Sequence, residues 1–207
     1  MKAMRKRDFP GTRDQSVTLR ETVNRRLAEK AAAEGMVLLK NEGHFLPLEP
    51  GTKVALYGAG ASMTVKGGTG SGDVNERESV SIYQGMKDAG YMITTEEWIH
   101  DYDLCYTKAR ENWRDGILEK VEKSGGERYF FDIYSKTPFV MPEGGRVEKT
   151  DAETAVYILS RIAGEGADRF CRPGDYLLTD VEKQQLKDIC SLYSHVETIV
   201  LLQRETL

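Results

Sequence analysis

The sequence predicts a single α/β domain, a three-layer sandwich built on a mainly parallel sheet. Short apolar runs alternate along the chain with segments whose apolar residues recur every three or four positions. Such alternation is typical of a parallel sheet with helices on both faces. The 207 residues are enough for one sizeable core, and no low-complexity linker divides them. We expect an N-terminal extension over residues 1–17 and the sandwich domain over residues 18–207.

The first helix is expected over residues 18–35. Thr18 and Glu21 have the spacing of a capping box, and apolar residues recur every four positions from Val23 onward. Asn41 and the glycine at position 43 then indicate a turn.

The first strand is expected over residues 53–57, a short run that is apolar in its middle and is followed by two glycines. This pattern predicts a buried strand that opens into a ligand-facing loop. Ser79 is a candidate cap for a helix that ends at Gly90, and residues 91–95 are a candidate second strand. The unit is therefore strand, loop, helix, strand.

A second long helix is indicated by apolar residues that repeat from Tyr106 to Val121, before a double glycine at 125 and 126. Residues 127–150 combine aromatic residues, two prolines and another double glycine. That mixture favours a short strand and an irregular excursion over a helix.

The last third of the chain predicts two more strands around one helix. Residues 155–162 are strongly apolar, Thr179 and Glu182 form a second capping box, and residues 196–202 are a β-branched run. Only five residues follow that run, too few for a helix to cover a core strand. We therefore expect the sheet to be incomplete at its C-terminal edge, and the chain to be part of something larger.

Composition excludes several classes of function. The formal net charge of −4 gives no long-range attraction to nucleic acid. No apolar stretch reaches the roughly 20 residues that cross a bilayer, so we expect no membrane partner. The basic residues near the N-terminus are interrupted by Asp8 and Asp14 and precede no apolar segment, which argues against a targeting signal. These features predict a cytoplasmic protein.

The three cysteines, Cys105, Cys171 and Cys190, are odd in number and lack a CxxC spacing. This arrangement suggests neither a disulfide framework nor a zinc site, and we expect free thiols. No metal and no organic cofactor is expected.

Two glycine-rich loops hold the candidate chemistry, one over residues 66–73 and one over residues 164–169. Glycine lacks the Cβ atom that would keep a ligand away from the backbone. Glu165 lies between two glycines, so its carboxyl group is the main candidate for catalysis. Spacing alone equally permits a solvated carboxylate paired with Arg169.

The first loop suits a sugar better than a nucleotide. The dinucleotide fingerprint is broken at Met63, and a phosphate-binding loop would need lysine where Asp73 stands. A sugar instead requires hydrogen-bonding groups on a backbone that it can approach closely. Candidates for sugar contact are Lys66, Gly67, Gly68, Thr69, Gly70 and Ser71. The remaining alternative is a flexible surface turn with no ligand.

Four blocks of sequence resemble a known family. They comprise residues 33–43 with 46–48, residues 53–58, residues 67–72 and residues 160–169. In this order they closely resemble the α/β sandwich domain of glycoside hydrolase family 3, the β-glucosidase family. The likeness extends from about residue 28 to residue 202.

This resemblance implies a retaining hydrolase of β-linked glucosides or xylosides, a mechanism that uses two carboxyl groups about 5 to 5.5 Å apart. In the family a (β/α)8 barrel domain holds the sugar and supplies an aspartate nucleophile, while the sandwich domain supplies the acid/base glutamate. Glu165 matches that glutamate, and Ser71 lies on the loop that lines the sugar subsite. Asp168 and Arg169 match the motif and are assigned only to loop support.

The chain cannot contain a barrel, because that domain needs about 250 residues. The resemblance therefore predicts a sandwich domain placed before its barrel, an inverted order, and an isolated chain that hydrolyses nothing. Its exposed face would favour self-association. The first alternative is a non-catalytic carbohydrate-binding or regulatory module, and the second alternative is a nucleotide-binding domain.

Overall fold

A computed structural model describes residues 16–65, 67, 79–162 and 170–202. The chain divides into two compact units, Met1–Leu48 and Glu49–Leu207. Each unit is described by itself.

The first unit contains helix α1, Leu19–Gly35. Thr18 caps it as expected: the Glu21 backbone N–H donates to Thr18 Oγ1 at 3.2 Å, and the Thr18 N–H donates to the Glu21 carboxylate at 2.7 Å. A short 3-10 helix, Glu42–His44, follows. Both side-chain groups of Asn41 bind the backbone of Leu46 at 3.0 Å, which closes the turn predicted there.

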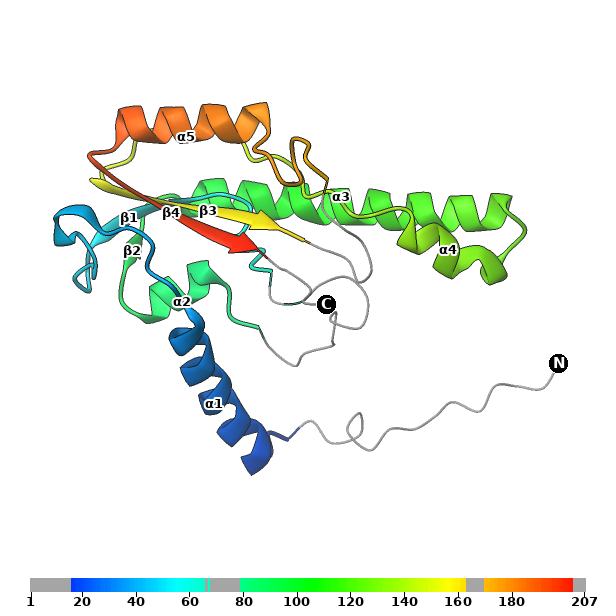
Figure 1. The fold of residues 1–207 in the computed structure, drawn as a ribbon, viewed down its shortest axis with the longest axis horizontal. Helices are drawn as coiled ribbons and strands as arrows, with labels where there is room; N and C mark the ends of the chain where they lie inside the picture. Colours follow the sequence, from blue (N-terminus) through cyan, green and yellow to red (C-terminus); the bar gives the residue numbers. More distant parts are fainter. Residues whose placement is uncertain (1–15, 66, 68–78, 163–169, 203–207) are drawn as a thin grey trace. The chain divides into compact units, whose positions relative to one another are not determined.

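The second unit is built on a four-stranded sheet, shown in Figure 1. Its strands are β1 (Lys53–Tyr57), β2 (Met92–Ile93), β3 (Thr154–Arg161) and β4 (His195–Leu202). They are ordered β2-β1-β3-β4, and every neighbouring pair is parallel. The predicted α/β class and parallel sheet are confirmed.

Helices cover both faces of this sheet. They are α2 (Ile82–Asp88), α3 (Glu96–Lys123) and α5 (Asp180–Leu192). The 3-10 helix η3 (Glu127–Tyr129) and α4 (Phe130–Ser135) contact α3 beyond the end of the sheet (Figure 1). In Figure 1, α2 and α5 lie on opposite faces, which gives the three expected layers. None of the helices in the described ranges is long and apolar enough to cross a membrane.

The core centres on the two inner strands. Tyr57 of β1 lies in register with Tyr157 of β3, and both side chains are buried on one face of the sheet. Ile189 of α5 is buried in the same cluster, and Trp98 of α3 packs against it. The Tyr57 and Trp98 rings meet edge to face with centroids 5.3 Å apart. This packing fixes β1, β3, α3 and α5 as one body.

Two predicted helix starts are corrected. Ser81 caps α2, because its side chain accepts the Gln84 N–H at 3.1 Å, whereas Ser79 is exposed. Helix α3 begins at Glu96 rather than near Tyr106. Its first turns bury Ile99 and Tyr102, whose three-residue spacing continues the apolar pattern toward the N-terminus.

The prediction of a short strand within residues 127–150 is wrong. The first nine of these residues are helical, in η3 and α4, and only the remainder is irregular. Tyr134 of α4 packs its ring against Trp113 of α3 at 5.7 Å. Contact with α3 therefore covers Tyr134, whereas Phe130 and Phe131 stay 43% and 78% exposed.

Candidate functional site

Most of the predicted site residues lie outside the described residues. These are Lys66, Gly68, Thr69, Gly70, Ser71, Glu165, Asp168 and Arg169. Gly67 alone of the predicted set is described, and it is partly buried. The described part of the site consists of the strands before the two glycine loops and the side chains that hold the chain on either side of them.

The pairing of β1 with β3 places the ends of the two strands that precede the glycine loops side by side. Val54 to Tyr57 lie beside Thr154 to Tyr157 in parallel register. The carboxyl ends of parallel neighbours meet at one edge of a sheet, where α/β proteins bind their ligands. The chain leaves β1 toward the first glycine loop and β3 toward the second, so both depart from this edge.

Gly58 holds the chain that leaves β1 against the backbone of β3. Its φ is +93°, and a Cβ atom there would lie 2.3 Å from the Ile158 carbonyl oxygen. The Gly60 N–H donates to that same oxygen at 3.2 Å. We expected these glycines to face a ligand, but Gly58 is needed for the close approach of two strands.

Thr64 closes the segment between β1 and the first loop. Its hydroxyl donates to the Gly60 carbonyl at 2.8 Å and accepts the Ile82 N–H at 2.9 Å. The Tyr83 N–H donates to the Ala61 carbonyl, also at 2.9 Å. The chain is thus fixed to the start of α2 two residues before Lys66.

A buried ion pair holds the end of β3. Both terminal nitrogens of Arg161 lie 2.6 Å from the two carboxylate oxygens of Glu182 on α5. The side chains are only 8% and 14% exposed. Arg161 Nε also donates to the Asp175 carbonyl at 2.8 Å. This fork-to-fork geometry joins strand, connecting segment and helix at one point.

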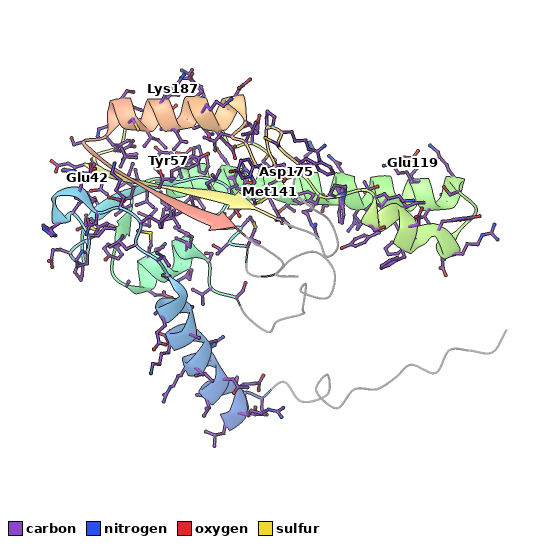
Figure 2. The ribbon with its side chains drawn as sticks, in the orientation of Figure 1. Glu42, Tyr57, Glu119, Met141, Asp175 and Lys187 are labelled. Carbon is purple, nitrogen blue, oxygen red and sulfur yellow. The ribbon has the colours of Figure 1, made fainter. Side chains whose placement is uncertain are left out.

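The far side of the second loop is tied to the same point. The Phe170 N–H donates to the Asp175 carboxylate at 2.8 Å, and Asp175 is labelled in Figure 2. The Thr179 N–H donates to Glu182 at 2.8 Å in the predicted capping box, which is confirmed. Residues on both sides of Glu165's loop are therefore held by the Arg161–Glu182 pair.

Sequence reasoning assigned no role to Arg161, Asp175 or Glu182 beyond the capping box. A signal was present: an arginine near the end of a strongly apolar strand requires a buried anion. Glu182, already expected at a helix start, was the available partner.

The buried tyrosines of the sheet are poor candidates for acid/base chemistry. Tyr57, labelled in Figure 2, donates its hydroxyl to the Glu148 carbonyl at 2.7 Å and contacts the Tyr193 hydroxyl at 3.0 Å. Burial raises the pKa of Tyr57 far above its usual value. Tyr157 donates to Gln185 at 2.9 Å, and burial raises its pKa too. At neutral pH both hydroxyls stay protonated and keep these hydrogen bonds.

No metal centre is apparent in the part of the chain that the structure describes. Nowhere in it do three His, Cys, Asp or Glu side chains gather closely enough to hold an ion. What the described residues offer is a rigid edge that carries two glycine loops.

Comparison with known proteins identifies relatives. The profile of the glycosyl hydrolase family 3 C-terminal domain matches residues 36–206. Beta-glucosidase A of Butyrivibrio fibrisolvens is 30% identical over 199 residues, which cover 84% of this chain and 22% of that protein. A beta-glucosidase of Ruminococcus albus is 33% identical, with 84% of this chain and 17% of that protein covered.

Solved structures agree with this match. Beta-glucosidase 3B from Thermotoga neapolitana, in complex with alpha-D-glucose, aligns with a TM-score of 0.60 and 29% identity. The alignment covers 86% of this chain and 24% of that one. A beta-glucosidase from Paenibacillus barengoltzii, at 24% identity and a TM-score of 0.64, shares the fold. The chain spans about a fifth of the length of the curated relatives it matches.

Proposed function

This chain belongs to glycosyl hydrolase family 3, and from that membership we propose that it supplies the proton donor for hydrolysis of β-glycosidic bonds. Glu165 is the proposed general acid/base. Residues 66–71 form the proposed sugar contact, and the proposed substrates are β-linked glucosides or xylosides.

The observation that supports this proposal best is the parallel pairing of β1 with β3. It brings the carboxyl ends of the two strands that precede the glycine loops to one edge of the sheet. A sugar held by one loop would then be within reach of a carboxyl group on the other. The Arg161–Glu182 pair anchors the chain on both sides of Glu165, and catalytic groups need such rigid support.

A retaining mechanism needs a second carboxyl group about 5 to 5.5 Å from the donor. We propose that an aspartate nucleophile comes from a (β/α)8 barrel domain, as in the family. Glu165 protonates the leaving oxygen and then, as a base, activates the water that releases the sugar. The 207-residue chain alone should therefore hydrolyse no glycoside.

The experiment is Glu165→Gln in the enzyme that joins this domain to its barrel, assayed with two aryl β-glucosides. Loss of an acid slows departure of a poor leaving group by about 10² to 10⁴-fold and largely spares an activated one. Glu122→Gln, which changes an exposed glutamate of α3, is the matched control and should leave both rates unchanged.

Equal losses on both substrates would contradict an acid role for Glu165. If the barrel-bearing enzyme is inactive on every glycoside while the chain still binds glucose or cellobiose in a titration, the domain is a non-catalytic carbohydrate-binding module.

A further inference from the structure

A groove of about 390 Å³ lies between α3 and the segment that follows β1. Met63 lines one wall, and the other is lined by residues of α3: Tyr106, Thr107, Arg110, Glu111, Trp113 and Arg114. Its volume falls within the range of small-molecule sites. Nothing in the proposed acid/base chemistry uses these residues.

The two walls are fixed to each other. The Ser62 hydroxyl donates to the Asp103 carboxylate at 2.5 Å and so ties the segment after β1 to α3. Thr64 fixes the other side of Met63 through its bonds to Gly60 and Ile82. The groove is therefore formed before any ligand arrives, which lowers the ordering cost of binding.

Arg110 is held in place by aromatic rings. Its guanidinium carbon lies 4.6 Å from the centroid of the Trp113 ring and 4.7 Å from that of Phe139. The Trp113 indole N–H donates to the Thr137 carbonyl at 2.7 Å, which fixes the ring. Stacking of this kind orients a planar guanidinium without using its N–H donors.

Those donors have no acceptor among the described residues, where Arg110 makes ring contacts but neither a hydrogen bond nor an ion pair. The contrast with Arg161, which binds a carboxylate and three carbonyl groups, is clear. Five oriented donors on the wall of a groove can bind a ligand's oxygen atoms.

The lining favours a neutral, hydroxyl-rich ligand. Arg110 supplies donors, Glu111 supplies acceptors, and the aromatic residues supply apolar contact surface. A second arginine of the lining, Arg114, is paired with Asp115 at 3.0 Å. The opposite charges of Arg110 and Glu111 therefore decide the balance, and they disfavour a strongly anionic ligand. Met63 also lies three residues before Lys66, where the proposed sugar loop begins.

We propose that this groove binds a second sugar ring of a β-linked oligosaccharide, beyond the ring held at the first glycine loop. The choice of a sugar rests on the proposed function, while the existence of the groove does not. Binding of a second ring in this groove would make the domain select longer saccharides over simple aryl glucosides.

Trp113 provides the signal for a direct test, because it is one of only two tryptophans in the chain. Cellotriose titrated into the 207-residue chain should change the tryptophan fluorescence, and Arg110→Ala should weaken that binding about tenfold or more. Arg128→Ala is the matched control, since Arg128 also stacks on a ring, that of Tyr129 at 4.7 Å. It should bind cellotriose like the unaltered chain.

Three results would overturn the proposal: no binding of cellotriose at millimolar concentration, equal binding by the Arg110→Ala and unaltered chains, or a full response to glucose alone. In the barrel-bearing enzyme, Arg110→Ala should raise KM for cellotriose and leave KM for an aryl glucoside unchanged. If Glu165→Gln leaves every rate unaltered while the fluorescence result holds, the acid/base assignment fails and the groove stands.

Discussion

At the scale of single residues, Arg161 is a buried charge that depends on one partner, Glu182. Its charge is almost fully buried and is balanced by Glu182 alone among the carboxylates it contacts within the described residues. Replacing it with alanine would leave the Glu182 carboxylate buried without its partner, and breaking a buried pair in this way costs about 3–5 kcal/mol. We expect Arg161→Ala to lower the free energy of unfolding by that amount in urea titrations.

Lys136→Ala is the control for this prediction, because it removes an exposed pair with Asp132, and exposed pairs contribute about 0–1 kcal/mol. Similar losses in the two variants would mean that the Arg161–Glu182 pair does not anchor the end of β3.

A second residue-scale prediction concerns Tyr57 and alkaline pH. Its pKa is raised in the folded chain, mainly by burial, so the folded state holds the phenolic proton more tightly than the unfolded state does. Its contribution is complete below the unfolded pKa of about 10 and is lost as the pH rises above it. We expect Tyr57→Phe to flatten the fall in unfolding free energy between about pH 9 and 11.

At neutral pH this variant should cost only about 1 kcal/mol, because the Glu148 carbonyl keeps the Tyr193 hydroxyl at 2.8 Å. Tyr176→Phe, which alters an exposed ring, should leave the pH profile unchanged. An unaltered slope in Tyr57→Phe would contradict the prediction.

At the scale of elements, the sequence predicted the features that depend on neighbouring residues alone. Both capping boxes, at Thr18 and at Thr179, form as expected, and β1 has the expected bounds. Residues 127–135 behave otherwise, because Tyr134 packs on Trp113 of α3, and sequence periodicity does not reveal a tertiary partner.

Gly58 supports an element-scale prediction, because the position needs both a positive φ and space beside Ile158. Backbone strain and overpacking each cost about 1–3 kcal/mol, so Gly58→Ala should lower the free energy of unfolding by at least about 2 kcal/mol. Gly116→Ala within α3 meets no atom within 4 Å. There the better helix propensity should raise stability by about 0.5–1 kcal/mol. Urea titrations that show the same sign for both variants would contradict this argument.

At the scale of the whole molecule, the sequence predicted the fold class, the four strands of the sheet and the family, but it wrongly added a strand within residues 127–150. It also placed each glycine loop after one of two strands that turn out to be neighbours. Motif spacing could not predict the Arg161–Glu182 pair or the groove at Arg110, since both depend on side chains that meet only after the elements pack. The assignment of Glu165 stays a prediction, because that residue lies outside the described residues.

The last prediction concerns association of the chain with itself. None of the residues of α1, all of which the structure describes, is buried. Leu19, Val23 and Leu27 follow one another at four-residue spacing and are 81%, 55% and 64% exposed. A contiguous apolar stripe of this kind favours contact with another surface. Sedimentation of the 207-residue chain should therefore show association that increases with concentration.

Replacing Val23 and Leu27 together with lysine should abolish this association, because the change places two charges on the apolar stripe. Asn24→Lys with Ala28→Lys adds the same charge on another face of α1 and should leave the association intact. That control separates loss of apolar contact from a general effect of net charge, which would dissociate both variants alike. A monomer at every concentration of the unaltered chain would show that the exposed stripe does not drive self-association.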